Sequence, residues 1–340
     1  MGEYVQAPEV EAEFDLVVIG GGPTGLLSAV LAEQLGASVC VIGRADALNA
    51  RTQQYLEIVG VLDGLLPKGI KCNKGSFKSR QSHWWTSLEY CFHRNFLMIG
   101  QPEVEKELLS QLEGNPVRYG EKVVSISETG TGVTVATDLG RTVRGKYAIA
   151  ADGARSTVRS ALNISFTGTK PEMVWMVLDT FIDTDFPGET TQERAEDSIR
   201  EHLAPYRVDF VKTEWFSTFD VRERIASTFV SNQGTGRIIL AGDAAHVHSV
   251  NGGQGLNTGI ADAFALSWRV ITAIKCKKLA PGAALDLIRS YDTERRQVAQ
   301  GVIDVAARLV RDTVHTAKQY VATIEKNAGY ITGKAAVPFA

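Results

Sequence analysis

A short glycine-rich turn between a strand and a helix constrains the fold of this chain more than any other feature of its sequence. Residues 15–19 read DLVVI, a β-branched run typical of a buried strand, and GGGPTG follows directly. LLSAVLAEQLG then has the pattern of a helix that ends at Gly36, and SVCVI forms a second apolar strand. Two buried strands joined through a helix require a right-handed crossover and a parallel sheet. The sequence therefore predicts an α/β fold.

The turn has the spacing G-x-G-x-x-G, formed by Gly20, Gly22 and Gly25, with Pro23 and Thr24 inside it. The first glycine permits the tight turn, the second lets a pyrophosphate approach the backbone, and the third lets the helix pack closely on the strand. A phosphate bound there lies at the positive end of the helix dipole. The turn is therefore predicted to bind a dinucleotide.

The end of the second strand departs from this pattern. An acidic residue usually stands there and binds the adenosine ribose, but this chain has Gly43 and Arg44. Arg44 could favour a 2'-phosphate, and an altered ribose site with a shortened loop explains the same residues equally well. Both interpretations stay open at this point.

The remaining elements follow from apolar periodicity and turn residues. An aromatic and polar stretch at residues 68–98 predicts strands and loops over a pocket. Other strands are predicted around residues 123–128, 133–138, 147–151, 173–183, 214–230 and 237–241, the first two as a hairpin. Helices are predicted within residues 43–66, 101–112 and 190–203, and from 259 onward with an interruption near Pro281 and Gly282.

Composition and charge exclude several classes of function. The chain has 340 residues with 36 basic and 39 acidic side chains, so its formal net charge is −3. No basic field exists to hold a nucleic acid or an anionic membrane surface. The four cysteines are far apart without a CxxC pair, which fits a reducing compartment, and the N-terminus lacks the pattern of a signal peptide. We expect a cytoplasmic protein without a membrane segment.

Two further motifs follow the glycine turn in order. The string DGARSTVR begins with Asp152 and Gly153, and GDAAHVHSVNGGQGLNTG begins with Gly242 and Asp243. With all three motifs the chain resembles the FAD-dependent aromatic hydroxylases, the single-component flavin monooxygenases, and most closely their phenol hydroxylase and 3-hydroxybenzoate hydroxylase branch. The resemblance extends from about residue 14 to about residue 300. It implies a Rossmann-like FAD-binding domain of the GR2 type, an interleaved substrate-binding β-sheet domain and C-terminal helices.

The resemblance also implies domain boundaries. The FAD-binding domain is expected over residues 14–70, 98–165 and 231–275, the substrate-binding sheet over 71–97 and 166–230, and the helical segment over 276–340. A stretch of substrate-domain sheet that the family carries is absent here, because Pro187 runs directly into Gly188. The substrate-binding sheet is therefore expected to be shortened near residues 187/188.

Several cofactor contacts are implied by motif. Asp243 would hydrogen-bond the ribityl chain of FAD, and the turn that includes Gly253, Gly255, Leu256 and Asn257 would present backbone N–H groups to the pyrimidine edge of the flavin. That edge becomes anionic on reduction, and a helix N-terminus stabilises such a charge.

The resemblance assigns four more residues to the cofactor. Asp152 and Gly153 would touch FAD and shape the approach of the nicotinamide, Gln101 would reach the ribityl region, and Arg51 would lie near the pyrophosphate. The chain has no second nucleotide fingerprint, which agrees with NADPH as a transient co-substrate.

Asp46 matches the acidic residue that contacts the substrate hydroxyl in phenol hydroxylases. A phenolate is a far better carbon nucleophile than a phenol, so a nearby base raises the rate. The alternative for Asp46 is a helix N-cap, since Asp commonly precedes such an apolar run. His246 and His248 stand at i and i+2, point to opposite sides of an extended chain and have no cysteine or acidic residue nearby in sequence, so we expect no metal site.

The implied reaction is hydroxylation of a phenolic ring with NADPH and dioxygen through a flavin hydroperoxide, catalysed by a protein that could form a homodimer. A second interpretation stays open. The missing substrate-domain stretch would also suit a catalytically impaired FAD-binding protein of the same fold.

Overall fold

The computed structural model describes residues 10–42, 48–72, 74–77, 80–84, 88, 91–112, 117–169, 174–184, 204–205, 207–220, 222–249 and 253–315. The chain forms two compact units. Unit 1 comprises Met1–Gly168 with Glu223–Ala340, and unit 2 comprises Thr169–Arg222. Unit 2 is therefore an insertion between two parts of unit 1. No helix among the described residues has the length and apolar character that a bilayer crossing needs.

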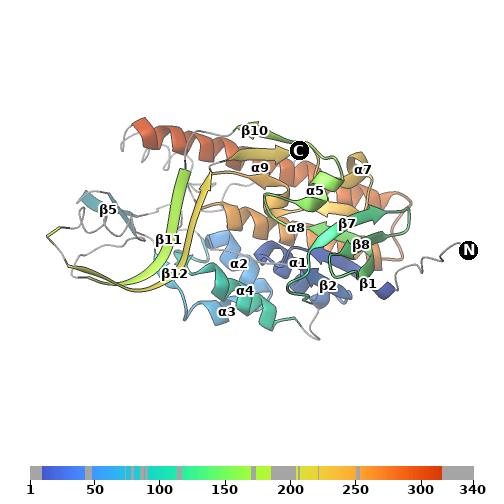
Figure 1. The fold of residues 1–340 in the computed structure, drawn as a ribbon, viewed down its shortest axis with the longest axis horizontal. Coiled ribbons are helices and arrows are strands. Elements are labelled where there is room, and N and C mark those ends of the chain that lie inside the picture. Colours follow the sequence, from blue (N-terminus) through green and yellow to red (C-terminus); the bar gives the residue numbers. More distant parts are fainter. Residues whose placement is uncertain are drawn as a thin grey trace, which may run out of the picture. The chain divides into compact units, whose positions relative to one another are not determined.

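A mixed sheet forms the centre of unit 1 (Figure 1). Its parallel strands are β1 (Val10–Ile19), β2 (Val39–Ile42), β9 (Thr142–Ala150) and β14 (Ile238–Leu240). The predicted hairpin is confirmed as β7 (Val123–Glu128) and β8 (Val133–Thr137), and β8 pairs antiparallel with β9. One edge of β9 is shared: its first half pairs with β8, and its last three residues pair with β14.

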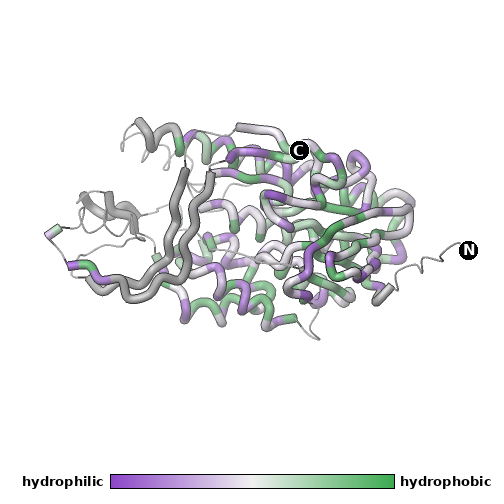
Figure 2. Tube along the Cα trace, viewed as in Figure 1, coloured by the Kyte–Doolittle hydropathy of each residue, from purple (hydrophilic) through white to green (hydrophobic). Residues whose placement is uncertain are grey.

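Helices cover this sheet and bury its strands. The helices α1 (Pro23–Gln34), α8 (Gly255–Lys275) and α9 (Ala283–His315) pack in series, α1 on α8 and α8 on α9. Leu16, Val17 and Val18 of β1 have no exposed surface, as expected for a parallel strand covered on both faces. Figure 2 shows the hydrophobic stretches among these central strands and helices, and hydrophilic residues along the outer turns.

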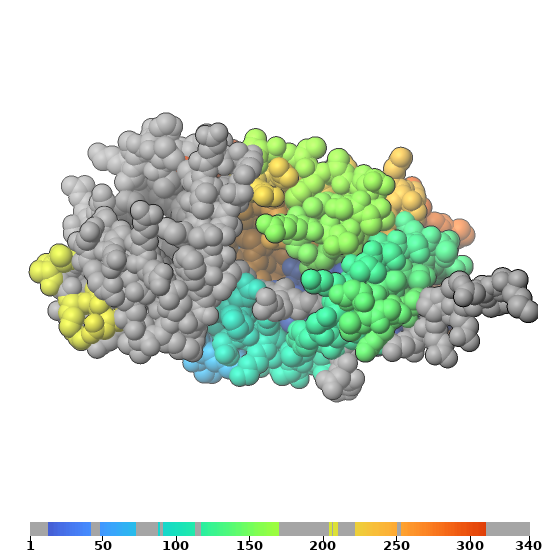
Figure 3. Space-filling model, in the orientation of Figure 1, coloured from blue at the N-terminus to red at the C-terminus, as the bar shows by residue number. Residues whose placement is uncertain are grey.

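Smaller elements complete unit 1. The helical ones are α2 (Ala50–Ile58), α3 (Leu62–Leu65), α4 (Gln101–Ser110), α5 (Thr157–Ala161), α7 (Ser231–Gly234) and a 3-10 turn at Gly242–Ala244. The paired strands are β3 (Ile70–Cys72) with β6 (Phe96–Met98), β4 (Lys74–Phe77) with β5 (Arg80–Trp84), and β13 (Glu223–Ala226) between β10 (Phe166–Thr169) and β15 (His246–Val247). In the space-filling view, residues of β7 to β10 form much of the visible surface of unit 1 (Figure 3).

One predicted helix is wrong in extent. The single helix expected within residues 43–66 is two helices, α2 and α3, because Gly60 has a positive φ of 77° and ends the first of them. The N–H of Gly60 bonds to the carbonyl of Glu57 and that of Val61 to the carbonyl of Leu56, the pattern of a glycine C-cap. The interruption predicted near Pro281 is confirmed, since α8 ends at Lys275 and α9 begins at Ala283.

Unit 2 contains one described pair of strands, β11 (Val174–Thr184) and β12 (Val208–Asp220), which run antiparallel over their whole length. The helix predicted at residues 190–203 and the junction of Pro187 with Gly188 lie outside the described residues. The division of the chain into compact units sets apart only residues 169–222. The grouping of 71–97 with 166–230 as one substrate-binding sheet therefore stays a prediction.

Candidate functional site

Three sequence motifs meet at one edge of the parallel sheet. Residues Ile19, Ala150 and Leu240, at the carboxyl ends of β1, β9 and β14, lie side by side in register. The N–H of Ala151 donates to the carbonyl of Ile19 at 2.6 Å, and that of Ala241 donates to the carbonyl of Ala150 at 2.9 Å. Each strand continues directly into a motif, so the three turns are neighbours. This is the edge at which open α/β sheets bind ligands.

Glycine makes the contact between the first two motifs sterically possible. Gly20 has φ +114°, and a Cβ there would lie 2.0 Å from the carbonyl oxygen of Ala151. A Cβ at Gly25 would lie 1.7 Å from the carbonyl oxygen of Gly20. No side chain fits at such distances, so Gly20 and Gly25 are required by the packing of the turn.

Thr24 lies where the first and third motifs meet. Its Oγ1 would stand 2.8 Å from a Cβ at Gly242 and 2.4 Å from a Cβ at Gly259. The side chain of Thr24, at the start of α1, therefore packs against the backbone of the turn after β14 and against the backbone of the second turn of α8. The sequence motif predicted Thr24 and Gly242 as cofactor residues, and it did not single out Gly259.

Two helix N-termini at this edge are suited to an anion. The N-cap of α1 is Gly22, followed by Pro23, and the N-cap of α8 is Gln254. Among the described residues, neither cap provides a side-chain oxygen that bonds an N–H of its own first turn, and neither first turn has an acidic side chain. The N–H groups of a first helical turn lack backbone partners and carry the positive end of the dipole. A ligand with negative charge would complete both ends.

The glycines before and at the start of α8 leave space. Gly253 has φ +61°, and a Cβ at Gly253 or Gly255 would meet no atom within 4 Å. Leu256, between them and Asn257, packs its side chain against the core instead. The space beside Gly253 and Gly255 therefore leaves room for a ligand next to this turn, and its role in binding flavin stays a prediction.

The side chain of Asp243 is accessible to solvent, although protein atoms surround much of it. It lies on the 3-10 turn, and its side chain is exposed. Desolvation nevertheless raises the pKa of its carboxyl, with the buried Asp262 adding to the effect and His246 opposing it. The carboxylate can thus accept hydrogen bonds from a small molecule while most of its surroundings are protein.

The carboxylate of Asp152 is used inside its own turn. Ser156 Oγ donates to Oδ1 at 2.5 Å, and the N–H of Val158 donates to Oδ2 at 3.2 Å. Asp152 therefore shapes the turn and the start of α5. The neighbouring Gly153 has φ +82° with nothing within 4 Å of a Cβ, so its backbone is the more open part of this motif.

Arg159 joins the second motif to the third. Its Nη1 donates to the carbonyl of Ala244 at 2.8 Å and its Nη2 to the carbonyl of Ala154 at 3.0 Å. The guanidinium lies over the ring of Phe166, 3.8 Å from its centroid. Desolvation lowers the pKa of Arg159, and Asp152 opposes that effect. The turn that carries Asp243 is held from this side by Arg159.

Asn257 connects α8 to α2. Its Oδ1 accepts from the N–H of Asn49 at 2.5 Å, and its Nδ2 donates to the carbonyl of Gly253 at 2.6 Å. The Oδ1 of Asn49 accepts from the N–H of Thr52 at 3.0 Å, so Asn49 is the N-cap of α2. The N-cap interpretation of Asp46 is therefore wrong for α2.

Arg51, predicted near a pyrophosphate, is the second residue of α2 and half-buried. Among the described residues its guanidinium makes no hydrogen bond or ion pair, so it remains available to an anion. Gln101 begins α4, which packs beside α1, and donates from Nε2 to Oε1 of Glu105 at 3.2 Å. Gly43, Arg44 and Asp46 lie outside the described residues.

Sequence reasoning missed the acidic partner of His246. Asp262 is 16 residues further along, and its Oδ2 lies 2.7 Å from Nε2 of His246. The sequence feature that could have revealed this partner is a charged residue on the apolar face of a helix. Asp262 is fully buried beside Ala263 and Leu266. His248 turns away, with Nδ1 donating to the carbonyl of Ser249 at 2.8 Å. The described residues contain no group of three potential metal ligands.

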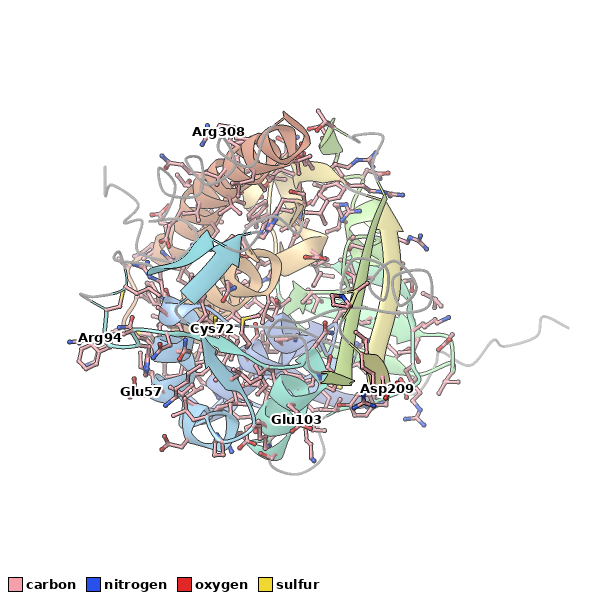
Figure 4. All side chains as sticks on the ribbon, turned by 90° about the vertical axis from the view of Figure 1, so that its left-hand side faces the viewer. Glu57, Cys72, Arg94, Glu103, Asp209 and Arg308 are labelled. Carbon is pink, nitrogen blue, oxygen red and sulfur yellow. The ribbon has the colours of Figure 1, made fainter. Side chains whose placement is uncertain are left out.

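A separate groove lies away from these motifs. Its volume is about 290 Å³, and it is lined by residues of α2, the end of α3, β3 and the segment 92–95. Figure 4 shows Glu57 and Arg94 on this side of unit 1, and Glu57 Oε2 lies 3.0 Å from Nε2 of His93. Of the predicted site residues that the structure describes, none lines this groove.

Comparison with known proteins gives a consistent result. The family model described as FAD binding domain matches residues 13–189 and 185–306. Rifampicin monooxygenase of Streptomyces venezuelae is 30% identical over 86% of this chain and 70% of its own length. Phenol 2-monooxygenase fsqG of Aspergillus fumigatus is 28% identical over 85% of this chain, which spans 59% of that relative. The structure of OxyS anhydrotetracycline hydroxylase from Streptomyces rimosus is similar with a TM-score of 0.78 and 26% identity, covering 97% of this chain and 78% of that one.

Proposed function

This chain belongs to the FAD-dependent aromatic hydroxylases, and on that premise we propose that it hydroxylates a phenolic substrate with NADPH and dioxygen at a flavin held on the edge of the parallel sheet. The observation that carries the proposal is the convergence of three turns, after β1, β9 and β14, at one edge. FAD, when bound and reduced, supplies the activation of dioxygen.

The residues at this edge fit FAD by charge and shape. A diphosphate suits the uncapped N-terminus of α1 at Gly22, Pro23 and Thr24. Arg51, which makes no ion pair with the described residues, would add a cation. Asp243 is an accessible acceptor for the hydroxyls of a ribityl chain.

The start of α8 suits the part of the flavin that gains negative charge. The backbone from Gly253 to Asn257 is open at Gly253 and Gly255, and its N–H groups point from the positive end of a 21-residue helix. Asn257 holds this turn against α2 through Asn49. Since α2 also carries Arg51, one hydrogen bond links the region that would contact the flavin to the region that would contact the diphosphate.

Asp46 would assist the substrate. It stands three residues before the α2 N-cap Asn49, and removing a proton from the phenol hydroxyl makes the ring carbon next to it more nucleophilic. The phenolic substrate is proposed from the activity of relatives such as phenol 2-monooxygenase fsqG, and NADPH as co-substrate is proposed from the resemblance of the motifs.

A glycine substitution tests the cofactor site without disturbing the fold. Gly255 has no positive φ, and a Cβ there meets nothing within 4 Å, so Gly255→Val should leave thermal stability near wild type. The new side chain would occupy the space in front of the α8 N-terminus and should abolish FAD binding, measured by flavin absorbance and by titration of the apoprotein. The control is Gly130→Val, in the hairpin turn, which is equally open. If Gly255→Val binds FAD as tightly as wild type does, the N-terminus of α8 is not part of the FAD site.

Activity is tested by measuring NADPH oxidation and product formation together over a panel of phenols. The proposal expects a hydroxylated product with one NADPH consumed per ring. One observation favours an alternative: the family match falls into two segments that overlap at residues 185–189, the place where the resemblance implies a shortened substrate-binding sheet. An impaired FAD-binding protein would bind flavin and oxidise NADPH with hydrogen peroxide as the only product.

A further inference from the structure

A buried ion network lies behind the turn that carries Asp243. Asp262 of α8 is 0% exposed. Its Oδ2 accepts from the N–H of Gly242 at 3.0 Å and lies 2.7 Å from Nε2 of His246. Its Oδ1 accepts from Nε of Arg295 at 2.7 Å. One carboxylate therefore holds the backbone of the turn, the strand after it and a side chain of α9.

This carboxylate is ionised in the folded protein. Desolvation alone would raise its pKa, but His246 and Arg295 outweigh that effect and hold the pKa of Asp262 below its usual range. A fully buried ion pair contributes little net stability, because the cost of removing two charges from water offsets most of their attraction. The network instead fixes geometry, because its carboxylate bonds the N–H of Gly242 in the Gly242–Asp243 turn.

The register of α8 places Asp262 over that turn. Asp262 lies seven residues after Gly255, two helical turns from the N-terminus and on the same face. Gly259, which lies between Gly255 and Asp262, packs closely on Thr24. This contact fixes the distance between α8 and the turn. Gly242 adopts φ +59°, and its N–H donates to Oδ2 of Asp262 in that conformation.

Helix α9 supports the same turn from behind. The hydroxyl of Tyr291 donates to the carbonyl of Leu240, the last residue of β14, at 3.0 Å. Arg295 is one helical turn further and bonds Asp262. Both side chains are buried. Tyr291 thus holds the end of β14, and Arg295, four residues further along α9, holds the carboxylate of Asp262.

We propose that Asp262, held by Arg295, is a positioning residue of the cofactor site, which fixes the Gly242–Asp243 turn so that the Asp243 carboxylate meets the ribityl chain. The inference rests on the proposed FAD site, and it assigns a role to a side chain that is 0% exposed and acts through the turn. Asp262→Asn keeps the size of the side chain and removes the charge that pairs with Arg295 and His246.

A double-mutant cycle in the full-length chain separates positioning from general support. Asp262→Asn, Asp243→Asn and the double variant are compared with wild type by the Kd of added FAD. Asp262→Asn is expected to weaken FAD about 10-fold to 100-fold, the usual effect of losing a partner that orients a ligand-binding group. In the Asp243→Asn background the same change should weaken FAD less than threefold, because the residue it positions is already altered.

The control is another ion pair between α8 and α9. Arg269 Nη2 bonds Glu294 Oε2 at 2.6 Å, and the other hydrogen bonds of Arg269 among the described residues go to Ala265 and Ser290. Glu294→Gln should leave the Kd of FAD unchanged. If Asp262→Asn yields too little folded protein, Arg295→Lys, which keeps the charge, enters the same cycle, and there a coupling with Asp243 of at least threefold is expected.

The outcomes are distinct. Equal loss of affinity in both backgrounds, or an equal loss in Glu294→Gln, overturns the positioning role and leaves the proposed function standing. A wild-type protein that takes up no FAD overturns both.

Discussion

His248 should make this protein lose stability between pH 7 and pH 5. Its Nδ1 donates to the carbonyl of Ser249, and its Nε2 is buried with no hydrogen-bond partner among the described residues. Desolvation lowers the pKa of the imidazole to about 4, the hydrogen bond to Ser249 opposes this, and His246 adds to it. The folded protein therefore keeps His248 neutral at a pH where the unfolded chain protonates it.

The size of the effect follows from the two pKa values. The unfolded value is about 6.5, so the difference is about 2.5 units, worth about 3 kcal/mol at 1.36 kcal/mol per unit. Between the two values the unfolded state binds more protons. The stabilisation is thus complete above pH 6.5 and is lost as the pH falls towards 4. Between pH 7 and pH 5 the loss amounts to about 2 kcal/mol.

Urea unfolding without added FAD, followed by tryptophan fluorescence at pH 7 and pH 5, measures this loss. His248→Gln removes the titrating group, so its free energy of unfolding should fall by about 2 kcal/mol less than that of wild type over the same interval. The matched control is His93→Gln, since His93 is partly exposed beside Glu57 and its replacement leaves the His248 contribution in place. Identical losses in wild type and His248→Gln would refute the reasoning.

Three further outcomes are expected. Gly20→Ala places a Cβ 2.0 Å from the carbonyl oxygen of Ala151 at φ +114° and should lower the free energy of unfolding by at least about 3 kcal/mol in a denaturant titration; a smaller loss would mean that the turn can open. Arg51→Ala should weaken FAD about tenfold while Arg51→Lys restores part of the affinity, and equal Kd values for all three proteins would count against a phosphate contact. Asp46→Asn should lower phenol hydroxylation by about 10² to 10⁴ with flavin content unchanged, whereas undiminished turnover would contradict a base at this position.

The sequence alone determined the local architecture of this protein. The run DLVVI, the glycine spacing and the helix that ends at Gly36 each depend on neighbours within a few residues, and all three are present in β1, the turn and α1. The position of the motifs at one edge also followed from sequence order, because each motif comes directly after a parallel strand. Local patterns failed at Gly60, where a positive φ divides an otherwise continuous helical periodicity.

Contacts between elements were decided by the tertiary structure. Asp262 reaches Gly242 across 20 residues, Arg159 reaches Ala244 across 85, and Asn257 reaches Asn49 across 208. No periodicity within one element specifies such partners, because they depend on how α8 packs on α1 and on the sheet. Asp262 on an apolar helix face signalled that a partner must exist, since an unpaired buried charge is too costly. Only the packing of α8 and α9 against the turn after β14 decided which groups those partners are.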